Sequence, residues 1–169
     1  MTVLKAGLHP VTSEKFRRLC IPLALIGQTV GDAPLSAGFH AVDGQYNTGG
    51  GWADYCAAVD LRPAHYNLAG ENVPMTRTEI YDLVSAASLL GICMFFRHPG
   101  FDGTPTTWPE HIHLVDAGVK MKPQLSMQVH DFRIGLNGLA SHGAYSFFTC
   151  SQYASGVIHS DWLSANGGS

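Results

Sequence analysis

A chain of 169 residues that is 46% hydrophobic and 14% charged has the composition of one folded domain with a sizeable core, which excludes a disordered protein. The formal net charge of -3, with no basic stripe, argues against a nucleic-acid-binding protein. No apolar run is long enough for a membrane span, and "CIPLALIG" is too short and too far inside the chain for a signal peptide. We therefore expect a single domain over residues 1–169, with no membrane partner.

The amino-terminal third predicts a helix, a long loop and a short strand. The helix begins after a capping residue at Thr12 or Ser13, and Pro22 breaks or kinks it. Residues 27–51 are rich in Gly, Asp, Asn and Pro and predict a long loop of the kind that often carries function. The segment "AAVDLRP" predicts a short strand that ends at Pro63.

The rest of the chain predicts two further strands and two helices. Thr76 and Glu79 have capping-box spacing before an amphipathic helix that ends at Gly91. The strands are "ICMFF" and "WPEHIHLV", a turn-rich loop joins them, and another helix begins near Pro123. Residues 160–169 predict a flexible tail. The fold class is α+β: a small, mainly antiparallel sheet with flanking helices and a long active-site loop.

The strand "WPEHIHLV" carries the most unusual pattern. Side chains alternate along a strand, so His111 and His113 face one side and Ile112 the other. Paired imidazoles on one face are typical of a metal or acid–base site. The alternative is one exposed histidine and one histidine hydrogen-bonded in the core.

Three separated residues are candidate metal ligands. A hydrolytic zinc site needs three protein ligands, an open position for water and a base. The candidates are His40 in "SAGFH", Asp60 in "AAVDL" and His113, each on or beside a short strand. Asp60 lies between apolar residues, so a buried carboxylate there needs a cation or hydrogen-bond donors, although an Asp that bonds a turn is an equal alternative.

An ordered set of segments resembles a known family of zinc enzymes. These segments are "GQTV", "SAGFH", "AAVDL", "FFRHPG", "TTWPEHIH", "MQVHDF" and "IGLNGL", over residues 12–140. They are similar to the D-alanyl-D-alanine carboxypeptidases and L-alanyl-D-glutamate endopeptidases of the lysostaphin-related superfamily, especially cell-wall hydrolases of actinobacteria and phages.

The resemblance implies a zinc peptidase that cleaves a stem-peptide or cross-bridge bond of peptidoglycan with a metal-activated water. Zn²⁺ would be held by His40, Asp60 and His113. The forked guanidinium of Arg97 suits a substrate carboxylate, although a surface ion pair is an equal alternative. The base would be His111, which strand alternation favours, or Glu110, which needs a bulge to reach the site. The protein would act from the host cytoplasm with later access to the cell wall, or as part of a virion, with possible homo-oligomeric association.

One spacing departs from that family. His40 and Asp60 are separated by an additional "AVDGQYNTGGGWADYC", and counting back from Asp60 by the family spacing reaches Ala53, which cannot bind zinc. We predict an inserted loop after His40, because lengthening a loop costs only about 0.6 kcal/mol per doubling. The alternatives are a degenerate, non-catalytic relative that binds cell wall or serves as a virion structural protein, and a hydrolase that uses Cys56 with His113 as base.

Overall fold

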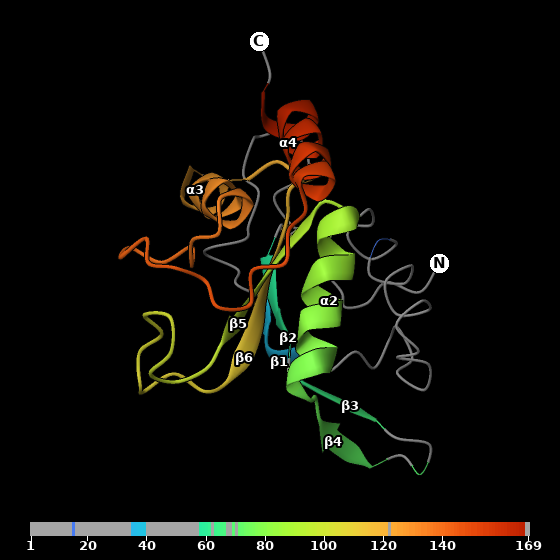
Figure 1. The fold of residues 1–169 in the computed structure, drawn as a ribbon, viewed down its shortest axis with the longest axis vertical. Coiled ribbons are helices and arrows are strands. Elements are labelled where there is room, and N and C mark those ends of the chain that lie inside the picture. Colours follow the sequence, from blue (N-terminus) through green and yellow to red (C-terminus); the bar gives the residue numbers. More distant parts are fainter. Residues whose placement is uncertain are drawn as a thin grey trace.

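The computed structural model describes residues 15, 35–39, 58–61, 63–66, 69, 71–121 and 123–167, and over these residues the fold is α+β (Figure 1). The main sheet has the strand order β1-β2-β6-β5, and each neighbouring pair is antiparallel, as predicted. Its strands are β1 (Leu35–Phe39), β2 (Ala58–Leu61), β5 (Ile92–Arg97) and β6 (His111–Asp116). The helices are α2 (Arg77–Leu89), α3 (Pro123–Arg133) and α4 (Gln152–Asn166). No helix in this described part of the chain is long and apolar enough to cross a membrane.

Helix α2 begins and ends where the sequence predicts. The Glu79 backbone N–H donates to Thr76 Oγ1 at 3.2 Å, and the Thr76 N–H donates to Glu79 Oε2 at 2.6 Å, so the capping box is complete. Gly91 follows the last turn with φ +76°, where a side chain would strain the backbone and a Cβ would lie 2.2 Å from Asp161 Oδ2. The two ends therefore follow from local sequence.

Helices α2 and α3 pack on opposite faces of the sheet. Phe95 of β5 packs edge-on against Phe132 of α3, with ring centroids 5.4 Å apart. Phe96, the next residue, lines a pocket with Ile80 of α2. Because neighbouring side chains on a strand point to opposite faces, Phe95 faces α3 and Phe96 faces α2, so the two helices cover opposite faces of the sheet.

Strand β1 and a hairpin differ from the sequence expectation. Residues 27–51 were expected to form a loop throughout, but Leu35–Phe39 pairs antiparallel with β2, with Leu35 opposite Leu61 and Phe39 opposite Val59. This strand is set by pairing with β2, because the local sequence "LSAGF" has little strand preference of its own. A short hairpin of β3 (Ala64–Tyr66) and β4 (Asn72–Pro74) was also not predicted.

The expected flexible tail at residues 160–169 is wrong over its described part, because α4 continues to Asn166. Ser151 caps the helix by accepting from the Ala154 N–H, and Ile158 is buried against the core. At its other end, the Asn166 side chain accepts from the Met121 N–H at 2.8 Å. These contacts link distant segments, so the tail sequence alone does not reveal them.

Candidate functional site

Polar side chains gather on the α3 face of the sheet. Asp60 of β2 is opposite His113 of β6, and Arg97 of β5 is opposite His111 of β6. Strand alternation places all four on one face, and each is at least nine-tenths buried. The prediction that His111 and His113 share a face, with Ile112 in the core, is therefore confirmed.

His113 lies between a carboxylate and an amide. Its Nδ1 is 3.1 Å from Asp60 Oδ1, and its Nε2 is 3.0 Å from Gln128 Oε1. A neutral ring carries one N–H, which His113 can donate either to Gln128 or to Asp60. In the tautomer that donates Nε2–H to Gln128, Nδ1 presents a lone pair to the Asp60 carboxylate, and a proton or a cation then fits between these two acceptors.

The distance between His113 Nδ1 and Asp60 Oδ1 fits two ligand atoms of one metal ion. Ligand atoms about 2.1 Å from a tetrahedral zinc ion lie roughly 3.4 Å apart, close to the 3.1 Å between His113 Nδ1 and Asp60 Oδ1. Zinc-binding histidines also characteristically donate their other ring N–H to a carbonyl or carboxylate oxygen, which here would be that of Gln128. Asp60 and His113 therefore suit two positions of a zinc site.

His40, the third predicted ligand, lies outside the described residues, as does the predicted insertion that follows it. Phe39, immediately before it, ends β1 opposite Val59, the neighbour of Asp60. Over the residues that are described, no group of three or more His, Cys, Asp or Glu side chains is arranged to hold a metal ion. The three-ligand site therefore stays a prediction, because the structure describes Asp60 and His113 but not His40.

His111 is oriented by the backbone. Its Nδ1 donates to the Pro109 carbonyl at 2.6 Å, which leaves Nε2 as the unprotonated nitrogen of the neutral ring. That Nε2 lies 3.9 Å from Asp60 Oδ2, too far for a hydrogen bond but within the same site. A histidine held in this tautomer can accept a proton through Nε2.

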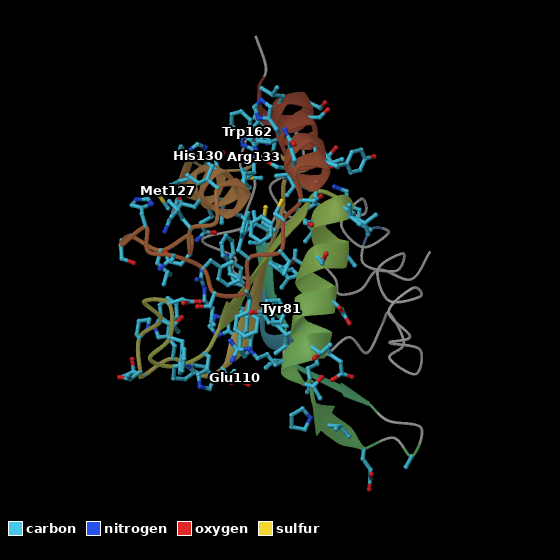
Figure 2. The ribbon with its side chains drawn as sticks, viewed as in Figure 1. Tyr81, Glu110, Met127, His130, Arg133 and Trp162 are labelled. Atoms are coloured by element: carbon cyan, nitrogen blue, oxygen red, sulfur yellow. The ribbon has the colours of Figure 1, made fainter. Side chains whose placement is uncertain are left out.

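Glu110, the other candidate base, is directed elsewhere. Its carboxylate hydrogen-bonds His98 Nδ1, and the two side chains line a second pocket of about 320 Å³ with Phe101 and Phe147. In Figure 2, Glu110 lies well apart from Met127, which lines the pocket beside His113. The structure therefore brings His111, and not Glu110, to the Asp60–His113 pair.

Arg97 is a buried cation, not a surface residue. It is 2% exposed, its Nη1 donates to the Asn137 carbonyl at 2.5 Å, and its guanidinium lies 4.7 Å from the Phe95 ring centroid. Burial lowers the pKa of Arg97 to about 10, although Tyr145, Asp60 and Asp102 counteract the shift. It remains charged at neutral pH, beside the site.

Arg97, His111 and His113 line a pocket of about 440 Å³, a volume typical of sites for small organic ligands. Its walls come from β5, β6, α3 and the segment that follows α3. The lining residues are Arg97, Trp108, His111, His113, Gln124, Met127, Gln128, Gly138, Leu139, Ala140 and His142.

Several of these residues were not singled out from the sequence. Gln128 appears there only within "MQVHDF", and His142 has no partner at ligand spacing. His142 Nδ1 is in fact 2.8 Å from the buried Asp131 Oδ2. Both contacts depend on how α3 and its following loop return to the sheet, which residue spacing does not encode.

Comparisons with known proteins give no assignment: no protein-family model, curated protein or solved structure matches this chain.

Proposed function

We propose that this protein is a zinc-dependent peptidase that hydrolyses a stem-peptide or cross-bridge bond of peptidoglycan. The observation that carries the proposal is the buried Asp60–His113 pair, whose Nδ1 and Oδ1 atoms lie 3.1 Å apart, a separation that suits two ligands of one metal ion. Gln128 behind His113, the pocket above the pair and the ordered resemblance of residues 12–140 to cell-wall peptidases support the same function.

Each residue has a distinct role in the proposal. Asp60 and His113 would hold zinc, with His40 as the third ligand. When bound, zinc supplies a Lewis acid that lowers the pKa of water toward neutrality and polarises a carbonyl. His111 accepts the proton of the attacking water through Nε2, and the fixed positive charge of Arg97 favours a substrate carboxylate in the pocket.

Zinc content and peptidoglycan cleavage test the proposal directly. The purified protein, loaded with zinc at neutral pH, should hold about one zinc per chain and release peptides or free amino groups from purified peptidoglycan. Asp60→Ala and His113→Ala should lose both properties. Asp82→Ala, at an exposed aspartate on α2, is the matched control and should keep both. A parent protein that takes up no zinc would refute the proposal.

The hypothesis of an insertion after His40 has a separate test. If His40 reaches the metal from before the insertion, His40→Ala should bind zinc more weakly than the parent. Equal affinity would contradict the insertion hypothesis and leave zinc with a different third ligand. A parent that binds peptidoglycan without zinc and without cleaving it would instead favour the non-catalytic cell-wall-binding alternative.

A further inference from the structure

The segment after α3 is fixed over the pocket by one buried side chain. Asn137 is 1% exposed, and its Nδ2 donates to the Asp102 carbonyl at 2.6 Å and to Ser141 Oγ at 3.2 Å. Its Oδ1 accepts from the Leu139 N–H, and its carbonyl accepts from Arg97. The segment is therefore attached to the same strand that contributes Arg97 to the site.

This segment holds His142 in an unusual conformation. His142 has φ +47°, in the left-handed region that residues other than glycine rarely adopt. Its N–H donates to the Leu139 carbonyl at 2.9 Å, and it lines the same pocket as His111 and His113. Such conformations persist where the surroundings fix them, and they are frequent at functional sites.

A buried carboxylate orients the His142 ring. Asp131, in the last turn of α3, is 2% exposed, and its Oδ2 accepts the Nδ1–H of His142 at 2.8 Å. The His142 side chain is 46% exposed, and no described residue hydrogen-bonds its Nε2. A carboxylate on Nδ1 fixes the tautomer and the direction of Nε2, as in other acid–base histidines.

We propose that His142 is a second catalytic proton-transfer residue, which donates a proton to the leaving amine, and that Asp131 is its positioning residue. This inference rests on the proposed peptidase function. The hydroxyl of water bonds to the carbonyl carbon, and the other proton of that water goes to His111 Nε2. As the C–N bond breaks, the leaving nitrogen takes a proton from Nε2 of protonated His142. Exchange with solvent then returns one proton to His142 and removes one from His111, so the net reaction consumes one water.

His111 and His142 have different proton-transfer roles in this proposal because they lie on different elements of the pocket wall. His111 lies on β6 beside Asp60, where the attacking water is expected, whereas His142 lies on the segment after α3. Both histidines line the pocket in which a substrate amide would bind. After donating its proton, His142 is left with the Nδ1–H that Asp131 accepts, so both protonation states keep the same hydrogen bond.

The test compares three variants by kinetics and nitrogen NMR. His142→Gln and Asp131→Asn should each lower kcat on a synthetic stem pentapeptide about a hundredfold, with KM and zinc content close to those of the parent. His130→Gln is the matched control, since Figure 2 shows His130 beside Arg133 and Trp162, with which it lines a different pocket. In the parent, the His142 ring should carry its proton on Nδ1 when neutral. The amide introduced by Asp131→Asn can donate to Nδ1 and should move that proton to Nε2.

The outcomes separate this inference from the proposed function. Parent activity together with full activity of His142→Gln would overturn the inference alone. If the parent does not cleave, the peptidase assignment fails, and a titration of the parent with the same pentapeptide, followed by nitrogen NMR, then decides whether His142 contacts the ligand. A shift of the His142 nitrogen resonances would support that contact, and unchanged resonances would overturn it. An Asp131→Asn variant that retains the Nδ1–H tautomer would overturn the positioning role.

Discussion

Replacing Gln128 by alanine removes the hydrogen-bond acceptor behind His113 without touching the proposed ligand atoms. Gln128 Oε1 lies 3.0 Å from His113 Nε2, on the side of the ring away from Asp60. Without it, the neutral ring is free to carry its proton on Nδ1, the atom proposed to bind zinc. We therefore expect Gln128→Ala to bind zinc more weakly although all proposed ligands remain.

The size of the effect follows from the contact that is lost. Loss of a hydrogen-bond partner behind a metal-binding histidine typically lowers affinity about 10- to 100-fold. This range corresponds to about 1.4–2.7 kcal/mol of binding free energy. A buried donor left without a partner costs about 1–3 kcal/mol, and since the His113 side chain is 9% exposed, water replaces Gln128 poorly.

The assay is a competition titration against a chromophoric zinc chelator at neutral pH. Gln124→Ala is the matched control, because Gln124 lies one turn earlier on α3 and lines the same pocket but is exposed. Gln128→Glu keeps an acceptor at the same place and should restore affinity. If Gln128→Ala binds zinc as tightly as Gln124→Ala, Gln128 does not orient a zinc ligand, and the proposed role of His113 is wrong.

Other predictions concern the base, the sheet edge and a buried ion pair. His111→Ala should keep zinc and lose about a hundredfold in cleavage rate. Glu110→Gln should cleave at the parent rate, because Glu110 faces the second pocket. Equal cleavage rates for the two variants would refute the assignment of His111 as the base. Tyr145→Phe should lower the free energy of unfolding, measured in urea, by about 2–4 kcal/mol. The Tyr145 hydroxyl accepts the Phe96 N–H at 2.7 Å and donates to the Met94 carbonyl at 2.9 Å, and the variant loses both bonds. A loss below about 0.5 kcal/mol would contradict this. Lys15→Met should destabilise by about 3 kcal/mol, because it removes the ammonium 2.7 Å from the buried Asp116 carboxylate. Burial alone lowers the pKa of Lys15, but the two aspartates that bind it outweigh burial and raise the pKa above 10.5. The parent should therefore keep this stability below pH 10.5 and lose it as pH rises through the folded-state pKa, while Lys15→Met should show no such loss.

Features governed by neighbouring residues could be predicted from the sequence. The capping box of α2 joins residues three apart, and strand alternation places His111 and His113 on one face. The antiparallel pair of β5 and β6 also follows, because a turn-rich loop and no helix joins the two strands. Each of these rules acts over a few residues, so the sequence contains all that they need.

Features governed by distant contacts could not be predicted in the same way. Strand β1 depends on pairing with β2, and the last turn of α4 depends on the contact of Asn166 with Met121. The pairing of Glu110 with His98 has the same origin. Glu110 precedes β6, so strand alternation does not fix its direction, and the loop that carries His98 decides it.

The contrast between the two faces of the sheet is the strongest physical reason to assign one of them to function. The α2 face of β5 and β6 carries apolar side chains: Met94, Phe96, Ile112 and Leu114. The α3 face of the same strands buries Arg97 and His113, and β2 adds Asp60. Burying such groups costs several kcal/mol per ion, and their hydrogen bonds offset this cost only in part. A sheet that needed only stability would be apolar on both faces, so the polar face is where a metal-binding and proton-transfer site is expected.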